Sequence, residues 1–204
     1  MPSFEAVCRR LFGQAGWMPK ALWGGALTFI PIVNFVAFGY LMEYVLRLHR
    51  NRDPELPEWR EFSILELFSE GSRYVGLLLG YVGLPMLAGW FLSSLLNLLT
   101  FGLLGVTAYS PLGIGALAGT VTFTAAVSVY AKDGLYSDAW RPREVLQLAL
   151  SGLRPLAIPV LAFWGLCVLA VPLYGFALFL GSWVLLSYSA ALFSIMDDKA
   201  HPVL

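Results

Sequence analysis

Charged residues are missing from three long stretches of the chain, and hydrophobic residues dominate each of them. The stretches cover residues 21–42, 74–131 and 155–196. A helix that rises 1.5 Å per residue needs about 20 residues to cross a hydrocarbon layer of about 30 Å, so the stretches have room for one, two and two spans. The pattern therefore predicts an all-α integral membrane protein with about five transmembrane helices. The four spans of the two longer stretches are expected at about 74–98, 112–131, 155–172 and 174–196.

The first of these stretches contains a helix break near its middle. Because Pro31 removes a backbone hydrogen bond and Asn34 follows it, the segment is either one kinked span or a re-entrant hairpin that turns between these two residues. Its length favours a single span, since each arm of a hairpin would cross only about half of the bilayer. Charge favours the hairpin, which places all thirteen Lys and Arg residues on one side of the membrane instead of ten. We favour the hairpin.

A fifteen-residue pattern occurs twice at an offset of 81 residues, at Trp59–Arg73 and at Trp140–Arg154. On a helical projection both segments place hydrophobic residues on one face and polar residues on the other. Trp at the entry and Arg at the exit are typical of helices that lie in the headgroup region. Both segments are therefore predicted to be amphipathic interfacial helices. The six identical pairs, where composition alone would give about one, are Trp59/Trp140, Arg60/Arg141, Leu65/Leu146, Leu67/Leu148, Gly71/Gly152 and Arg73/Arg154.

Each amphipathic segment precedes two predicted spans, which gives a parallel internal repeat within a single membrane domain, residues 1–204. The first repeat unit covers residues 57–131 and the second covers residues 138–196. The N-terminal helix and the first hydrophobic segment occupy residues 3–49. If that segment is a hairpin, the chain contains three units of the same kind.

Composition agrees with this assignment. The chain is 58% hydrophobic and 13% charged, with a mean hydropathy of +0.72, so its charged fraction is about half that of an ordinary soluble domain. The formal net charge is zero, but Lys and Arg concentrate around the two repeated segments, and the turns near 100–111 and 171–175 contain none. By the positive-inside rule, the amphipathic segments and the C-terminus are expected in the cytoplasm. The protein is then a multi-pass protein of the cell (inner) membrane, without a cleavable signal peptide.

Two groups of residues are candidates for contact with the membrane surface. The candidate membrane-interface anchors are Trp59, Arg73, Trp140 and Arg154. The candidate cluster for anionic lipid headgroups comprises Arg47, His49, Arg50 and Arg52. Each basic residue near the surface attracts anionic lipid by about 1 kcal/mol, although the same cluster could serve only to orient the chain in the membrane.

Two further groups lie within the hydrophobic stretches. Small residues at a spacing of four let helices approach closely in lipid, and the candidate helix-packing residues are Gly76, Gly80, Gly115 and Gly119. The candidate intramembrane polar residues are Asn34, Glu43 and Asn97. A charge at depth is costly, so Glu43 could be a proton or cation site, but a helical pair with Arg47 explains it equally well.

Residues for catalysis or metal binding are scarce. The chain has two histidines, and it contains no Ser-His-Asp set, glycine-rich phosphate loop or paired-histidine motif. Asp197, Asp198 and His201 could ligate a metal, but such a group after a span is more typical of a solvated helix end. Cys8 and Cys167 are too few and too separated for a disulfide framework. The sequence therefore predicts no enzyme, no cofactor and no nucleic-acid partner.

Short motifs occur in order along most of the chain. They are Ile30-Pro31-Ile32-Val33-Asn34, Gly39-Tyr40-Leu41, Leu56-Pro57-Glu58-Trp59, Gly71, Tyr130-Ala131 and Ser137-Asp138-Ala139-Trp140. In this combination the chain resembles an uncharacterised prokaryotic membrane family, the domain-of-unknown-function family numbered 4013. The most specific parts are the proline-asparagine break before Gly39 and the Leu-Pro-Glu-Trp segment. The resemblance implies a multi-pass membrane protein of bacteria or archaea, with no assigned activity or catalytic residue.

These observations lead to two main functional hypotheses. The first is a non-catalytic accessory or scaffolding subunit of a membrane complex, or a membrane-organising protein. Its partners would be the lipid bilayer, anionic headgroups, and other membrane proteins or further copies of the chain. The second is a small oligomeric transporter or channel, whose broken helices should recur at corresponding positions of the repeats. Because Pro85 lies twelve residues after Arg73 and Pro159 lies five after Arg154, the sequence favours the first hypothesis.

Overall fold

The computed structural model describes residues 3–50 and 55–200, with side chains up to Asp197, and these residues form helices and turns with no strand among them. The eight α-helices of the described residues are α1 (Phe4–Phe12), α2 (Trp17–Thr28), α3 (Asn34–Arg50), α4 (Ile64–Leu78), α5 (Leu84–Leu99), α6 (Ser110–Asp133), α7 (Pro142–Leu169) and α8 (Tyr174–Ala200). Short helical turns join some of them: η1 (Trp59–Glu61), η2 (Leu79–Gly83), η3 (Gly105–Tyr109), η4 (Asp138–Trp140) and η5 (Val171–Leu173).

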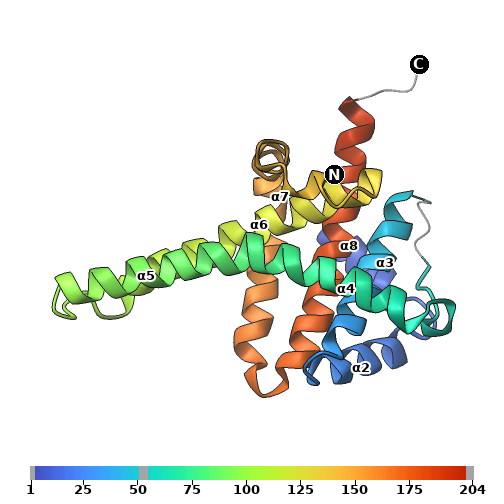
Figure 1. Cartoon of the computed structure of the whole chain (residues 1–204), viewed down its shortest axis with the longest axis horizontal. Helices are drawn as coiled ribbons and strands as arrows, with labels where there is room; N and C mark the ends of the chain where they lie inside the picture. The colour runs from blue at the N-terminus through green and yellow to red at the C-terminus, as the bar shows by residue number, and fades with distance from the viewer. Residues whose placement is uncertain (1–2, 51–54, 201–204) are drawn as a thin grey trace.

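The long helices form three antiparallel hairpins, which are α2–α3, α4/α5–α6 and α7–α8 (Figure 1). Helix α8 is the centre of the fold, because it packs against α1, α2, α3, α6 and α7. The far part of the second hairpin, α5 with the start of α6, projects from the rest of the molecule, transverse to α7 and α8 (Figure 1). We call this projection, residues 84–115, the arm.

Four of the described helical runs are long and apolar enough to cross a membrane: Ile64–Leu99, Gly105–Asp133, Pro142–Leu169 and Val171–Asp197. They correspond to the two longer uncharged stretches, and the turn at Val171–Leu173 is where the sequence predicts it. The runs differ in burial. In the most apolar 18 residues of Val171–Asp197, 72% are buried inside the protein, against 17% in those of Ile64–Leu99. The described residues therefore give one central and three more peripheral candidate spans.

The fifth expected span is not a single helix. Residues 29–33 separate α2 from α3, with Pro31 in the turn and Ile32 in the left-handed region at φ 72°. A β-branched residue adopts this conformation only at a sharp turn, so the helix cannot continue through it. The two helices have 12 and 17 residues, which is why the first hydrophobic stretch is not among the candidate spans.

The predicted boundary between the first amphipathic segment and its span is not a helix boundary. Helix α4 begins after Ser63, whose hydroxyl accepts from the Glu66 backbone N–H while the Glu66 carboxylate accepts from the Ser63 backbone N–H. From there the helix runs without interruption to Leu99. Its one irregularity is the wide π turn at η2, where the Leu84 N–H donates to the Leu79 carbonyl. Pro85 follows at once and has no N–H, which accounts for the distortion.

Helix α7 also joins an amphipathic segment to a span, but it bends between them. In Figure 1 its first part is seen end-on, and its second part then runs alongside α8. Pro155 and Pro159 lie inside the helix, where each removes one backbone hydrogen bond and crowds the preceding turn. The two copies of the repeated segment thus enter their spans differently, α4 straight and α7 through a bend.

Helices α3 and α4 approach each other so closely that their backbones are in contact. A Cβ added to Gly39 would overlap the backbone carbonyl of Leu67, and one added to Gly71 would overlap that of Phe35. Beside this crossing the rings of Phe38 and Tyr74 stack at 4.8 Å. Only glycine permits this separation, because any side chain would push the two backbones apart.

We expect Gly39→Ala to destabilise the protein, because the overlap is with backbone and neither helix can yield locally. Overpacking of this kind costs about 1–3 kcal/mol. Gly113→Ala is the matched control, since nothing lies within 4 Å of a Cβ at that helical position, and alanine there should be neutral or stabilising by up to about 1 kcal/mol. Thermal unfolding in detergent measures the stability of both variants. Equal unfolding midpoints for the two would contradict the backbone contact.

Candidate functional site

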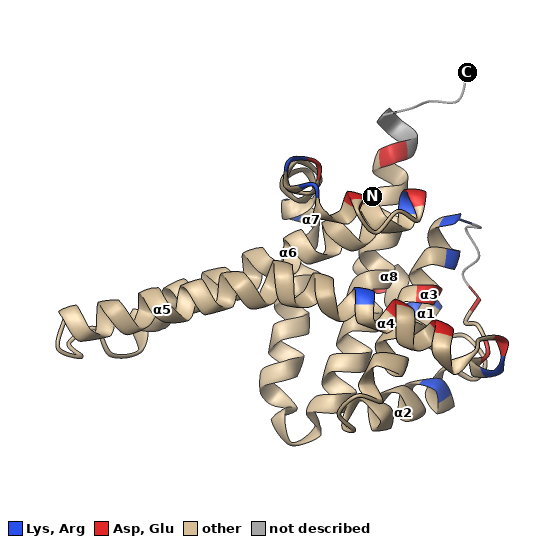
Figure 2. Cartoon of the chain, viewed as in Figure 1, with Lys and Arg blue, Asp and Glu red and all other residues tan. Residues whose placement is uncertain are grey.

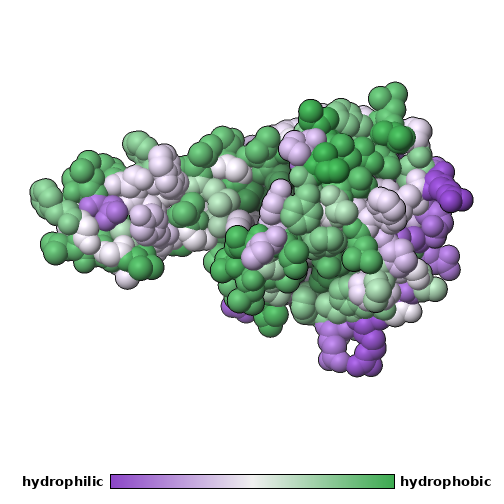
Figure 3. All heavy atoms as spheres, turned by 90° about the horizontal axis from the view of Figure 1, so that it is seen from below, coloured by the Kyte–Doolittle hydropathy of each residue, from purple (hydrophilic) through white to green (hydrophobic). Residues whose placement is uncertain are grey.

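Charged residues of the described chain lie away from the arm. In Figure 2 they lie at the start of α7 and the ends of α3 and α8 in the upper part, and at α2, the turn before α4 and the start of α4 toward the lower right, whereas the arm and the lower parts of α7 and α8 carry none. Hydrophobic residues cover much of the face seen in Figure 3, including the arm. The polar side chains that could form a site therefore lie in these charged regions.

The segment before α4 is tied to α2 and α3. Lys20, a buried residue of α2, donates to the Leu56 carbonyl at 2.8 Å and pairs with the exposed Glu58 carboxylate at 2.7 Å. Tyr40 of α3 donates its hydroxyl to the Pro57 carbonyl at 2.8 Å. These contacts hold the Leu-Pro-Glu-Trp segment against α2 and the first part of α3.

Each repeated tryptophan is held by a tyrosine of a neighbouring helix. Trp59 stacks on Tyr40 with ring centroids 4.1 Å apart, and Trp140 stacks on Tyr81 at 5.6 Å. Tyr81 also donates its hydroxyl to the Ala139 carbonyl at 2.6 Å, as Tyr40 does to the carbonyl two residues before Trp59. The matched tryptophans thus have matched partners, which fix the chain where it enters each amphipathic segment.

A buried polar cluster joins α4 to α6. Tyr130 donates to the Glu70 carboxylate at 2.8 Å, and Arg73 donates to the Tyr130 hydroxyl at 2.7 Å while pairing with Glu70. Tyr130 is 1% exposed and Glu70 is 9% exposed, so their hydrogen bonds replace those that water would make. Arg73, predicted as an interface anchor, is in this structure the cation of an internal cluster.

The predicted headgroup cluster is divided. Arg47 pairs with Glu61 at 2.6 Å and lies over the Phe62 ring at 4.4 Å. This guanidinium and the Glu58 backbone N–H lower the pKa of the Glu61 carboxyl. His49 lines a pocket of about 400 Å³ with Lys132, Glu144 and Asp197, among others, and Arg50 lies against Gly134. Arg52 falls outside the described residues.

The candidate packing glycines lie against different partners. Gly115 and Gly119 of α6 face the backbone at Pro85 and Tyr81, so α6 packs closely on the distorted turn before α5. Gly76 lies against the Tyr136 hydroxyl and Gly80 against the Trp140 ring, so these two make room for the segment between α6 and α7.

The three candidate polar residues do not converge on one site. Asn34 begins α3, and its buried Oδ1 has no hydrogen-bond partner among the described residues. Glu43 is half-buried on α3, and Asn97 is half-buried near the tip of the arm. At the end of α8, Asp197 pairs with Lys132 at 2.7 Å; the side chain of Asp198 and all of His201 are outside the described part.

A cavity of about 280 Å³ lies where the second and third hairpins meet. Its walls are almost wholly apolar and include Phe38, Met86, Phe123 and Phe163. The polar groups at its edge are satisfied within the protein, because Tyr74 donates to Ser182 at 3.0 Å and the Trp164 indole donates to Thr120 at 2.9 Å. Such a space suits an apolar group better than an ion or a polar solute.

Sequence reasoning missed the residues that make these interhelical contacts. Lys20, Tyr40 and Tyr81 were not singled out as site residues, and neither was Glu70, which is buried although its segment is predicted to be an amphipathic helix. One signal was available: a Gly-Tyr pair occurs at 39–40 and again at 80–81, each on a hydrophobic stretch that later meets a repeated tryptophan. Nothing in the sequence could pair Tyr130 with Glu70, sixty residues apart.

We expect Tyr40→Phe and Tyr81→Phe to lower the free energy of unfolding by about 0.5–1.5 kcal/mol each, because each leaves a carbonyl without its hydroxyl donor. Tyr109→Phe is the control, since that tyrosine is 48% exposed on the arm. Chemical unfolding in detergent micelles measures the three variants. A loss at Tyr109 equal to the other two would show that the hydroxyl contacts contribute nothing specific.

Comparison with known proteins yields one match. The model of the family described as protein of unknown function DUF4013 covers residues 24–186, which include the α2–α3 break, the Leu-Pro-Glu-Trp segment and the buried cluster. No curated protein and no solved structure matches the chain. Since the matched region is most of the sequence, the chain belongs to the DUF4013 family of proteins of unknown function.

Proposed function

We propose that this protein is a non-catalytic subunit of an integral-membrane assembly, and that its arm is the element through which it associates. The observation that carries the proposal is the exposure of the arm. Of the sixteen residues of α5, only Gly89 and Ser93 are buried, and α5 packs mainly on α6. Large apolar side chains cover its other faces: Leu87, Trp90, Phe91, Leu92, Leu95, Leu98 and Leu99.

The direction of the arm argues for association rather than for lipid contact alone. Because the arm runs transverse to α7 and α8, the two hairpins diverge, and no described helix lies in the angle between them (Figure 1). Aromatic residues such as Trp90 and Phe91 provide large rigid surfaces, which dominate the binding energy of interfaces. A helix of another subunit would fill the space and cover these rings.

Within this proposal the amphipathic segments face the cytoplasm of a prokaryotic cell, and the membrane is the inner membrane. The absence of Lys and Arg from the uncharged stretches and their turns, and their presence around the amphipathic segments, support that orientation by the positive-inside rule. The break at Pro31 between helices of 12 and 17 residues, each shorter than a span, supports a re-entrant α2–α3 hairpin. The matched Trp59 and Trp140 contacts support a parallel repeat with interfacial segments.

A small transporter is the second candidate function. The observation that favours it is the polar pocket between α3, α6, α7 and α8, where His49, Lys132 and Asp197 meet. Against it, the central cavity is apolar, and a polar solute would need hydrogen-bonding groups along its whole path. The subunit is therefore the better-supported proposal.

We expect the protein, extracted in mild detergent and transferred to lipid discs, to run as an assembly larger than one 22.4 kDa chain. The double variant Trp90→Ala/Phe91→Ala should weaken the assembly at least tenfold, because an aromatic residue central to an interface contributes about 2 kcal/mol. Val168→Ala/Leu169→Ala is the matched control, as these residues are equally exposed at the tip of the α7–α8 hairpin. Mass photometry measures the size.

A single chain without partners, both before and after substitution, would overturn the assembly proposal. An assembly that is insensitive to the arm variant would reject the arm as its contact. Solute flux into liposomes containing the purified protein would instead establish the transporter.

We expect a reporter fused after Leu204 to be active only in the cytoplasm, and a cysteine placed at Ser3 to resist a membrane-impermeant reagent added outside the cell. The reason is that the hairpin arrangement puts all the basic residues on one side. External labelling at Ser3 would mean that residues 21–46 cross the membrane once, and external reporter activity would reverse the orientation.

A further inference from the structure

An apolar groove of about 450 Å³ runs between α6 and α7 on the outside of the molecule. It is formed by Leu117, Ala118 and Val121 of α6 and by Leu153, Ala157 and Leu161 of α7, and Arg154 lines it as well. From Leu153 to Leu161 the groove follows α7 for about 12 Å. Arg154 is the last charged residue before the uncharged stretch 155–196, so the groove begins at a cation and continues along apolar side chains.

The Arg154 guanidinium is exposed and has no ion pair or hydrogen bond with any residue in the described part of the chain. Its counterpart in the first repeated segment is Arg73, which pairs with Glu70 and donates to Tyr130. At the offset of 81 residues Glu70 becomes Ser151, whose hydroxyl donates to the Leu148 carbonyl of its own helix. The same arginine is thus neutralised inside the protein in one copy and left without a counter-ion in the other.

We propose that this groove binds one anionic phospholipid, with the headgroup phosphate on Arg154 and an acyl chain between α6 and α7. The charge selects the ligand. Because lipid tails are as apolar as the side chains of the groove, burying a tail there gains little over leaving it in the bilayer. A phosphate next to a guanidinium without a partner among the described residues gains a charge-assisted, bidentate contact that an apolar chain cannot supply. Phosphatidylcholine carries the same phosphate, but its choline cation cancels the charge and so weakens the attraction to Arg154.

The site meets the arm only at Ile114 and is separate from the central cavity. It lies on the outer side of α7, where the helix bends at Pro155, and it shares none of its lining residues with the 280 Å³ cavity. Pro155 and Pro159 lie inside α7 beside the groove, and farther along the helix the Trp164 indole donates to Thr120 of α6 at 2.9 Å, so the two helices remain in contact beyond it. The inference rests on the proposed membrane embedding, but it requires neither an assembly nor the arm.

Native mass spectrometry of delipidated protein tests the site, with dioleoylphosphatidylglycerol as the anionic lipid and dioleoylphosphatidylcholine as the comparison. We expect the first phosphatidylglycerol to bind more tightly than phosphatidylcholine, and Arg154→Gln to weaken it about fivefold, the equivalent of about 1 kcal/mol per basic residue at the surface. Ala157→Phe should weaken it too, because the ring would occupy the groove beside Arg154 while keeping the charge.

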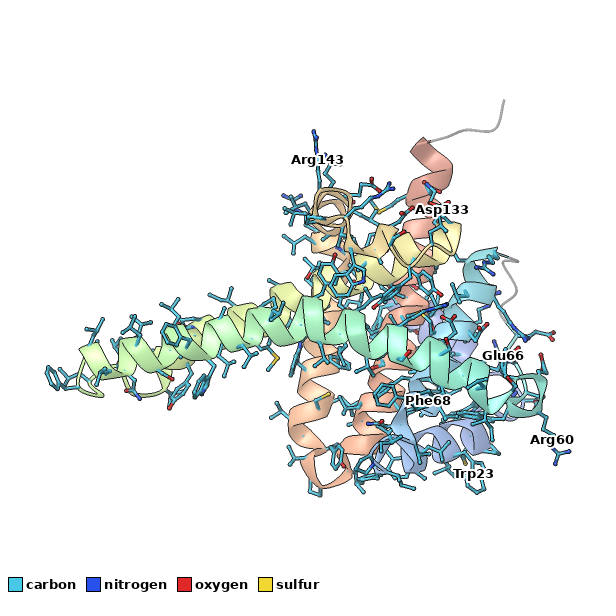
Figure 4. All side chains as sticks on the ribbon, in the orientation of Figure 1. Trp23, Arg60, Glu66, Phe68, Asp133 and Arg143 are labelled. Atoms are coloured by element: carbon cyan, nitrogen blue, oxygen red, sulfur yellow. The ribbon has the colours of Figure 1, made fainter. Side chains whose placement is uncertain are left out.

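Arg143→Gln is the matched control. Arg143 belongs to the same helix and is exposed, but it projects away from the body (Figure 4) and does not line the groove, so its loss should leave binding unchanged. Equal losses for Arg143→Gln and Arg154→Gln would reduce the effect to general surface charge and overturn the site. Displacement of the lipid by an excess of inorganic phosphate would show an anion site without a lipid.

Two measurements in the same samples separate this inference from the proposed function. Unchanged circular dichroism shows that Arg154→Gln and Ala157→Phe are folded, and Arg154→Lys should bind more tightly than Arg154→Gln but less tightly than the unsubstituted protein, because lysine keeps the charge and loses the bidentate contact. The size of the assembly reports on the arm independently. Lipid binding that is insensitive to both groove variants would overturn the lipid site, whatever the oligomeric state.

Discussion

The contact between the backbones of α3 and α4 is the constraint on which the rest of this structure depends. Because Gly39 and Gly71 let the two helices touch, Tyr40 lies close enough to the following loop to hold Pro57 and Trp59. The same approach fixes α4, which brings Glu70 and Arg73 to Tyr130 on α6. In lipid, where apolar surfaces gain little from meeting each other, close packing and buried hydrogen bonds such as these position the helices.

Two tyrosines and one lysine of the apolar helices donate hydrogen bonds to carbonyls of the polar loops. A hydroxyl group that donates to a loop carbonyl satisfies backbone that leaves a helix, while its ring remains in the hydrophobic interior. Lys20 does the same with its ammonium group, which also meets a carboxylate. Tyr40 in this way joins the Gly39-Tyr40 pair to the Leu-Pro-Glu-Trp segment, and Tyr130 joins α6 to Glu70 and Arg73 of α4.

The two similar segments differ at their charged positions, while the contacts of their tryptophans are alike. Trp59 and Trp140 have equivalent tyrosine partners, but the arginine that closes each segment has a carboxylate in one copy and a serine in the other. The helices also differ, since α4 runs straight into α5 and α7 bends at its prolines. The first segment therefore pairs its closing arginine inside the protein, whereas the second presents Arg154 beside an apolar groove with no partner among the described residues.

The sequence by itself determined the helical class, the uncharged segments, the break at Pro31 and the position of the last turn, because these follow from local composition and from residues that cannot continue a helix. It could not decide that four helices and not five meet the length of a span, nor that the predicted boundary at Arg73 lies inside a continuous helix. Only the tertiary structure decided which polar residues are partners: Arg73 with Glu70, Lys20 with Glu58, and Arg154 with none of the described residues. The physical reason is that pairing depends on the distance and direction between helices far apart in the chain, which side-chain periodicity does not encode.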